Sequence, residues 1–412
     1  MNPDRFRDSP SGRLVKVGEG EIAYWAFVPH PLSPALEPDW ALTQAISEAD
    51  RAVSELAGVG RTMPNPHLLI GPFIRREAVH SSRIEGTQAD VTDLYAYQVG
   101  QLSLPGMAPG PPEADVKEVH NYVRALEYGL QRLETLPVSL RLLRELHERL
   151  MEGVRGEHAT PGEFRRTQNW IGPPGGNPKE APFVPPPVRQ MHEALHALEE
   201  YLHSDDVYPP LVRLAMIHYQ FEVIHPFIDG NGRLGRLLIS CLLVSWGLLP
   251  EPLLYLSAFF SRHRQDYYDL LMAVSERGAW TEWISFFLEG VAEQSRDAVF
   301  RARRLQDLRT DWHERLTEAR ASALLLQLAD HLFDSPVITI PEAERLLGVT
   351  YRSAQLNVEK LVDADILRQV GEADYGKTFC RWRDTGRGRH RSRLSKRARR
   401  NRTALDSIEE LR

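Results

Sequence analysis

The chain contains very little cysteine and no long apolar segment. Only Cys241 and Cys380 occur among its 412 residues, which excludes a disulfide framework and a thiolate metal cluster. The longest apolar run near the middle, residues 237–249, is interrupted by serine and glycine and is too short to cross a bilayer. The first 13 residues lack the apolar stretch of a secretory signal. We therefore expect a cytoplasmic protein with no membrane partner.

Composition and charge place the chain among ordinary globular proteins. Hydrophobic residues make up 42% and charged residues 26%, which suits a protein with buried cores. Its length predicts two or three domains. The net charge of -6 hides a run, residues 387–402, with nine Lys or Arg residues and no acid. The rest of the chain is therefore about -15. Such a tail either binds nucleic acid through phosphates or is a solvated end, and composition leaves both open.

The apolar spacing predicts a mainly α-helical body. Residues 40–56, 114–133 and 140–151 repeat apolar side chains every three or four positions. Two segments rich in Pro and Gly, 104–112 and 172–187, break this pattern. The first is typical of a connector. The second ends in three consecutive prolines, so it predicts an extended edge segment that cannot become a central strand.

The pattern changes after residue 301. A charged helical connector over 301–316 is followed by a smaller unit with helices expected at 321–332, 341–347 and from Thr350 to about 364. Thr350 is placed to cap the third helix.

Two short strands, 367–370 and 378–382, complete this unit, which resembles a winged helix-turn-helix. Its third helix is the candidate recognition helix. The candidate contacts to DNA or to a partner protein are Tyr351, Arg352, Gln355 and Asn357. The sequence does not decide between DNA binding and protein docking, and it leaves a homodimer open.

One loop between two apolar helices carries the residue types of phosphoryl chemistry. A buried helix is expected over 211–224, and another begins at about Leu234. The residues between and just after them are His225, Pro226, Phe227, Ile228, Asp229, Gly230, Asn231, Gly232, Arg233, Leu234, Gly235 and Arg236. Unpaired N–H groups at the start of the second helix can bind phosphate, and the glycines allow close approach.

The side chains of this loop suggest distinct roles. His225 can accept a proton near neutral pH, and Asp229 is a hard oxygen ligand suited to Mg²⁺. Arg233 and Arg236 add cationic donors for phosphate. An Asp-Gly-Asn-Gly sequence is also typical of a hairpin turn, but the helical patterns on both sides argue against a hairpin. The complete string favours catalysis.

This string resembles the signature of the Fic family at every position that defines it. The resemblance implies an all-α fold with a short β-hairpin flap. It also implies transfer of AMP from ATP to a Ser, Thr or Tyr hydroxyl of a target protein or of the chain itself, with release of pyrophosphate. His225 would be the general base and Asp229 would hold Mg²⁺. The nucleotide would be bound by Gly230, Asn231, Gly232, Arg233, Leu234, Gly235 and Arg236.

The resemblance extends beyond the string. Phe183 and Val184 would lie on the flap, where a target main chain adds as a strand. An ordinary Pro-rich loop is the alternative. Tyr267 and Tyr268 lie in the stretch that lines the adenine site in the family, although both residues could equally be core aromatics.

The expected divisions follow from this resemblance and from the C-terminal pattern. They are an N-terminal helical region (1–112), a catalytic core (113–300) with its flap (172–187), the connector (301–316), the winged helix-turn-helix (317–384) and a disordered basic tail (385–412).

An upstream segment resembles the inhibitory motif of the same family. Residues 81–86, Ser-Ser-Arg-Ile-Glu-Gly, end a helix expected over about 73–86. The resemblance implies that Glu85 pairs with Arg236 and takes the charge that the γ-phosphate needs. The alternative is a surface helix whose Glu85 pairs with any exposed arginine. Some family members use this glutamate to remove AMP, and the sequence does not exclude that activity.

Two other functions remain as alternatives. The C-terminal pattern and basic tail would also suit a DNA-binding regulator whose Fic-like core only binds nucleotide. Related folds transfer phosphate or phosphocholine, but the Gly230-Asn231-Gly232-Arg233 segment favours AMP.

Overall fold

The computed structural model describes residues 1–37, 39–63, 67–98, 110–154, 160–173, 175–319, 321–370 and 377–381. The predicted basic tail and the turn between the last two strands lie outside these residues. The described chain divides into two compact units. Unit 1 comprises Met1–Arg61, His80–Gly86 and Asn121–Ala298. Unit 2 comprises Thr62–Val79, Thr87–His120 and the described part of Val299–Arg412.

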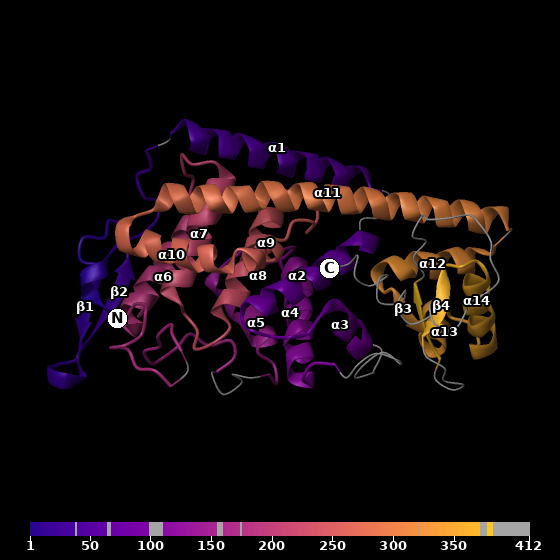
Figure 1. The fold of residues 1–412 in the computed structure, drawn as a ribbon, viewed down its shortest axis with the longest axis horizontal. Helices are drawn as coiled ribbons and strands as arrows, with labels where there is room; N and C mark the ends of the chain where they lie inside the picture. Colours follow the sequence, from indigo (N-terminus) through magenta and orange to yellow (C-terminus); the bar gives the residue numbers. More distant parts are fainter. Residues whose placement is uncertain are drawn as a thin grey trace, which may run out of the picture. The chain divides into compact units, whose positions relative to one another are not determined.

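Helices dominate both units (Figure 1). Unit 1 contains, wholly or in large part, α1 (Trp40–Thr62), α4 (Glu113–Arg132), α5 (Leu140–Leu150), α6 (Val188–His203), α7 (Pro210–Ile224), α8 (Asn231–Ser245), α9 (Ser257–Arg262), α10 (Arg264–Arg277) and the start of α11 (Trp280–Glu318). None of the described helices is long and apolar enough to cross a membrane.

The core of unit 1 is built around α7 and α8. Both helices are buried on almost every side, as expected for helices whose sequences are apolar all round. Helix α7 packs against α6 and α8, and α8 also packs against α5. The loop between Ile224 and Asn231 is therefore held at both ends by buried helices, as the sequence predicted.

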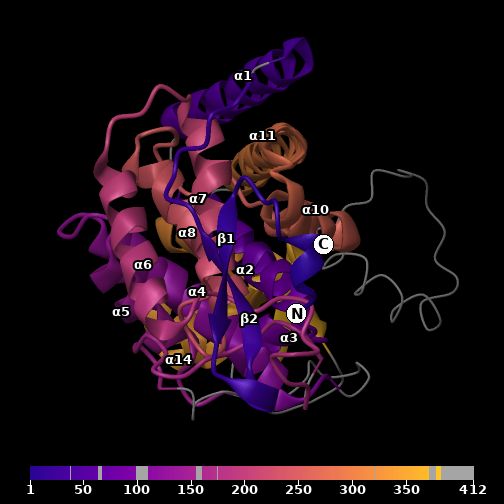
Figure 2. The same cartoon turned by 90° about the vertical axis from the view of Figure 1, so that its left-hand side faces the viewer.

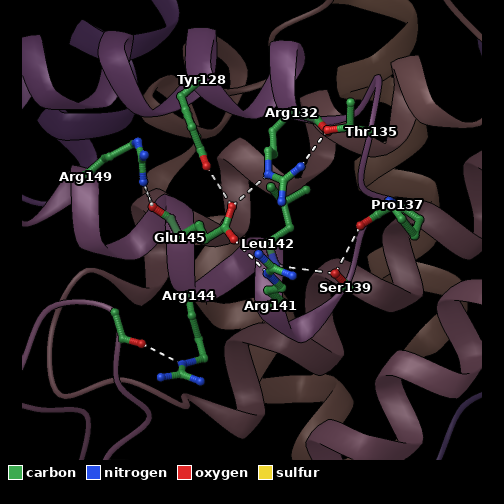
Figure 3. Close-up of polar contacts among 11 residues, drawn as sticks. Tyr128, Arg132, Thr135, Pro137, Ser139, Arg141, Leu142, Arg144, Glu145 and Arg149 are labelled. Atoms are coloured by element: carbon green, nitrogen blue, oxygen red, sulfur yellow. Dashed lines mark hydrogen bonds and ion pairs between the residues drawn. The ribbon is translucent and has the colours of Figure 1, made fainter.

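Helix α5 is oriented by a polar cluster centred on Glu145 (Figure 3). The Glu145 carboxylate accepts hydrogen bonds from Tyr128 at 2.7 Å, Arg132 at 3.1 Å and Arg141 at 2.9 Å. Desolvation alone would raise the pKa of Glu145, but these three donors lower it to about 2. The cluster ties α5 to α4 and so fixes the face of α5 that carries His147.

The first 30 residues differ from the predicted helical region. Strands β1 (Gly12–Val17) and β2 (Tyr24–Pro29) form an antiparallel hairpin, seen side by side in Figure 2. Their sequences, Gly-Arg-Leu-Val-Lys-Val and Tyr-Trp-Ala-Phe-Val-Pro, are rich in β-branched and aromatic residues, which favour strands. Each run of six residues is too short for the apolar spacing of a helix to be distinguished from that of a strand. Strand β2 packs against α6 and α7.

The flap is less regular than the expected hairpin. Within the described part of 172–187, the backbone pairing is a single β-bridge between Ile171 and Phe183. Prolines on both sides of Phe183 and Val184 remove the N–H donors that a longer ladder needs.

Unit 2 contains α3 (Val91–Gln98), the first part of α2 (His67–Ile84) and the C-terminal elements. The latter are α12 (Ala323–Asp334), β3 (Val337–Thr339), α13 (Ile340–Leu347), α14 (Tyr351–Asp363), β4 (Leu367–Val370) and β5 (Thr378–Arg381). The three strands form one antiparallel sheet in the order β3-β5-β4.

These elements confirm the three C-terminal helices and the two strands expected from the sequence. Gly348 ends α13 with a φ of 62°, and the Thr350 hydroxyl accepts a hydrogen bond from the N–H of Ser353, as expected for a cap. Strand β3 was not predicted. The expected connector is the second half of one continuous helix, α11. The winged-helix assignment and the other domain limits stay predictions.

Candidate active site

The loop between α7 and α8 has a specific backbone conformation. His225 ends α7 with a φ of 48°, a region that few residues other than glycine adopt. Gly230 precedes α8 with a φ of 79°, and a Cβ there would lie 2.8 Å from the Met151 sulfur. Glycine is therefore required at 230 both by its backbone angle and by space.

Two buried asparagines hold the loop closed. The Asn231 side chain accepts from the N–H of Phe227 and donates to its carbonyl, each at 2.9 Å. The Asn169 amide donates to the same carbonyl at 2.8 Å. Asn231 is 2% exposed, so its side chain supports the loop, and its backbone N–H at the start of α8 is the group left for a ligand.

Arg165 anchors the start of the loop between α7 and α8. This fully buried guanidinium donates to the His225 carbonyl from Nε at 3.0 Å, and to the carbonyls of Thr167 and Pro186. Burial lowers its pKa to about 10, so it stays charged at neutral pH. Arg165 thus joins the loop between α7 and α8 to the flap segment.

His147, which the sequence did not single out, holds the part of the loop that carries Asp229. Its Nδ1 accepts the N–H of Gly162 at 2.9 Å, so Nε2 carries the proton and donates to the Asp229 carbonyl at 3.0 Å. Its ring stacks on Phe227 with centroids 3.8 Å apart. Burial lowers the pKa of His147 to about 4, which keeps this tautomer neutral.

The ring of His225 is oriented for proton transfer. Its Nδ1 lies 3.2 Å from the Glu222 carbonyl, which can only accept, so Nδ1 donates and Nε2 keeps its lone pair. Burial lowers the pKa of His225 to about 4. The neutral, proton-accepting form therefore predominates at neutral pH.

Asp229 lies at the open side of the loop. Its side chain is 51% exposed, and its Oδ1 accepts the N–H of Gly230 at 2.6 Å and lies 3.9 Å from Arg233. Arg233 itself is buried and donates toward the Met151 sulfur at 3.6 Å. Among the described residues there is no cluster of three or more His, Cys, Asp and Glu side chains placed to hold a metal ion.

Arg236 is bound by the end of α2. Its Nε donates to the Ser81 hydroxyl and its Nη2 to the Ser81 carbonyl, both at 2.9 Å, and Nη2 also donates to Glu85 at 2.7 Å. The Arg236 side chain is 1% exposed and that of Glu85 is 35% exposed. A Cβ on Gly232 would lie 2.3 Å from the Glu85 carboxylate, so Glu85 lies directly over the glycine turn.

The ion pair between Glu85 and Arg236 favours the charged form of both side chains. Burial alone would raise the pKa of Glu85, but the Arg236 guanidinium holds it below its ordinary value. Glu222 is a second carboxylate near Arg236, and burial raises its pKa to about 7. A Cβ on Gly235 would lie 2.3 Å from Glu222 Oε1, so Gly235 leaves room for this side chain. Leu234 is fully buried.

The two tyrosines have different positions. Tyr267 is 1% exposed, and its hydroxyl lies 2.9 Å from Nε2 of buried His218. Tyr268 is 38% exposed, and the Arg264 guanidinium lies over its ring at 5.4 Å. Arg264 also donates to the Ile84 carbonyl at the end of α2. Tyr268 is therefore the one of the two with surface open to a ligand.

The flap residues are buried rather than open. Phe183 is 3% exposed and Val184 is fully buried. The Val184 carbonyl accepts the N–H of Phe27 in β2 at 2.9 Å.

In unit 2, the candidate contacts on α14 are divided. Tyr351 is 51% exposed, and Arg352 and Gln355 belong to a chain of exposed hydrogen bonds that ends at Glu359. Asn357 is 7% exposed and donates to the Ser353 carbonyl within α14. Its side chain supports the helix and is not presented to a partner.

Comparison with known proteins matches two family models to this chain. The Fic/DOC family N-terminal model matches residues 43–131, and the Fic/DOC family model matches residues 137–243. The second range contains the His225–Arg236 loop, and the first contains Glu85.

Curated relatives carry the name protein adenylyltransferase Fic. The protein from Aedes aegypti is 28% identical over 205 residues, which is 48% of this chain and 36% of the relative. The protein from Drosophila grimshawi is 30% identical over 204 residues, which is 48% of this chain and 37% of the relative. The alignment thus spans little more than a third of each relative's length.

A solved structure shows the same fold. The crystal structure of a Fic family protein from Desulfovibrio desulfuricans G20 superposes with a TM-score of 0.54 at 20% identity, over 87% of this chain and 100% of that chain. Residues 43–131 and 137–243 are therefore similar in sequence to the two regions of Fic/DOC family proteins, and the fold is that of a solved Fic family protein.

Proposed function

We propose that this protein is an adenylyltransferase that moves AMP from ATP to a hydroxyl group of a protein. The observation that carries the proposal is the His225 ring, which has a free Nε2 lone pair and lies in one loop with the N-terminal amides of α8. A general base beside a phosphate-binding helix end is what attack of a hydroxyl on a nucleotide phosphate requires.

The residues of the loop would have different roles in binding the nucleotide. The backbone N–H groups of Asn231 and Gly232 would bind phosphate oxygens, and Arg233 and Arg236 would neutralise their charge. Gly230, whose own N–H is held by Asp229, supplies the backbone turn that brings these groups to the nucleotide. Leu234 and Gly235 position these groups: Leu234 anchors the first turn of α8 in the core, and Gly235 leaves space for Glu222.

The acceptor hydroxyl loses its proton to His225 Nε2, and its oxygen bonds to the α-phosphorus. The bond from that phosphorus to the oxygen bridging the β-phosphate breaks, and pyrophosphate leaves. General-base assistance contributes about 10²–10⁴ in rate.

Mg²⁺ fits the residues around the loop. One Asp229 oxygen is bound to the Gly230 N–H, and the half-exposed carboxylate leaves the other oxygen for a metal. Mg²⁺ is commonly held by one or two carboxylates together with substrate phosphates and water. When bound, the ion would neutralise charge on the phosphates.

We further propose that the protein rests in an inhibited state. Glu85 already neutralises Arg236, and its carboxylate would repel a γ-phosphate placed at the glycine turn. Nucleotide would then bind in a pose unfit for attack. The same carboxylate could orient water for removal of AMP, so both directions belong to this site.

The position of the label distinguishes AMP transfer from other chemistry. With ATP labelled at the α-phosphate, the Glu85→Gly protein should label an acceptor protein or itself. ATP labelled at the γ-phosphate should give no label. Label from the γ-phosphate would instead indicate phosphate transfer.

The C-terminal elements suggest a second role. The order α12, β3, α13, α14, β4 and β5 supports the proposal of a winged helix-turn-helix, and exposed Tyr351, Arg352 and Gln355 lie on its third helix. This module would contact DNA or dock a partner protein. A mobility shift that weakens steeply with salt indicates DNA, and no shift at low salt excludes it.

A further inference from the structure

The flap offers very little backbone for strand addition. Phe183 uses both its N–H and its carbonyl to pair with Ile171, at 3.5 and 2.9 Å. Because neighbouring residues of an extended chain face opposite sides, Val184 faces away from Ile171. The positions on either side, Pro182 and residues 185–187, are prolines without an N–H. Val184 is therefore the residue through which another strand can join this edge.

Strand β2 already occupies that position. Phe27 donates its N–H to the Val184 carbonyl at 2.9 Å. Its neighbours Ala26 and Val28 pair with β1, opposite Val15 and Arg13. The hairpin thus adds its second strand to the flap as an incoming peptide would. Figure 2 shows the two strands of this hairpin in front of unit 1.

An aromatic cluster strengthens this contact. The ring centroids of Phe27 and Phe183 are 5.8 Å apart, and Phe6 lies 5.6 Å from Phe27 and 6.0 Å from Phe183. All three rings are almost fully buried. An extended segment that replaced β2 would therefore gain most if it placed an aromatic side chain where Phe27 lies.

The occupied edge is tied to the catalytic loop. Arg165 donates to the carbonyls of both Pro186 and His225, so the flap segment and the general base are held by one guanidinium. An extended acceptor bound at Val184 would be held at a fixed position relative to His225.

We propose that β2 is an exchangeable occupant of the flap edge, so that the hairpin and an extended acceptor segment with an aromatic residue bind this edge in turn, never together. The role of this exchange in selecting acceptors rests on the proposed AMP transfer. Binding of an extended segment at the flap edge does not require nucleotide.

The test uses a fluorescein-labelled peptide of residues 20–31, which contains β2, with fluorescence anisotropy in the absence of ATP. The Phe27→Ala protein keeps the β2 N–H but loses the ring, so the peptide should bind it about tenfold more tightly than the wild type. Trp25→Ala is the matched control, because it removes another aromatic from the same strand. A peptide carrying Phe27→Ala should bind neither protein well.

A second measurement uses the wild-type protein and so does not depend on how a variant folds. At saturating peptide, the amides of residues 24–29 should exchange hydrogen faster, because the hairpin leaves the flap. Those of β3 should not change. Binding without faster exchange at 24–29, or equal affinity for wild type and Phe27→Ala, would overturn the proposal.

AMP transfer is then measured separately in the Glu85→Gly background. The peptide should lower transfer to a protein acceptor, and Phe27→Ala should raise it. Absence of all transfer there would contradict the adenylyltransferase activity, yet leave the binding result standing. Peptide binding with no effect on measurable transfer would contradict the docking role of this edge.

Discussion

Glu85 and Arg236 form an ion pair at 2.7 Å although they lie 151 residues apart in the sequence. All three hydrogen bonds described for Arg236 go to the end of α2, through Ser81 and Glu85. Arg236, the cation proposed to bind a γ-phosphate, is thus held by residues from outside its own loop. The proposed inhibition follows from this one pair of charges.

Replacement of Glu85 by glycine should release Arg236. A hydrogen bond to a charged group is worth about 1.5–3 kcal/mol, so AMP transfer should rise about ten- to hundredfold. Arg83→Ala, an exposed change on the same helical turn, is the control and should leave the rate as it is. Transfer of label from α-labelled ATP measures both. Equal rates for wild type and Glu85→Gly would remove Glu85 from this role.

Ser81→Ala should give a smaller release. It removes the hydroxyl that accepts from Arg236 Nε but keeps the Ser81 carbonyl and Glu85. We expect an increase of at most about tenfold. Ser82→Ala is matched in size and burial, and its hydroxyl is not a described partner of Arg236. A larger effect from Ser82 than from Ser81 would argue against the described contacts.

The acid limb of the rate profile should report His225. The neutral ring accepts the proton, and its pKa is lowered to about 4, so kcat/KM should fall as the pH drops through about 4 and stay level from about 5.5 to 7. Circular dichroism checks that the fold persists at the acid end. A midpoint near the ordinary value of about 6.5 would show that the ring is not buried in the working enzyme.

How far the sequence predicts the site depends on the range of the interactions. The His225–Arg236 loop is local, so its residue order alone indicates base, metal ligand and phosphate donors. The contact between Glu85 and Arg236 could be predicted because the motif around Glu85 is also local. The structure adds what holds them, and those contacts join distant segments, such as Arg165 with both His225 and Pro186.

Roles of single side chains were harder to predict. Asn231, at the start of α8, and Asn357, in the middle of α14, both turn inward and bond to nearby backbone, as short polar side chains often do. His147 lies on an apolar helix face, where a histidine more often belongs to the core. The β1–β2 hairpin was missed because each strand is only six residues long.

His147→Ala should lower AMP transfer by about 10²-fold, because the Asp229 backbone loses its support and a small displacement of catalytic groups is costly. His147→Asn can keep one of the two hydrogen bonds and should recover part of the rate. His196→Ala, an exposed histidine on α6, is the control. If His147→Ala retains the full rate at saturating ATP, the Asp229 backbone does not need this support.

Gly235→Ala should destabilise the protein by about 1–3 kcal/mol, because the new Cβ would lie 2.3 Å from Glu222 Oε1. In the Glu222→Ala background the shortest contact is gone and only Phe221 Cδ1, at 3.1 Å, still crowds the new Cβ, so the same change should cost less than about 1 kcal/mol. Thermal unfolding of the four proteins measures this difference. The same loss in both backgrounds would show that Glu222 does not fill this space.

Intact-mass spectrometry of the Glu85→Gly protein, incubated with ATP and Mg²⁺ and an acceptor protein, decides whether the protein transfers AMP through His225. We expect an addition of about 329 Da per AMP on the acceptor or on the protein itself. We expect none in the Glu85→Gly/His225→Ala protein. The same addition with His225 replaced, or an addition of about 80 Da for a phosphate, would contradict this mechanism.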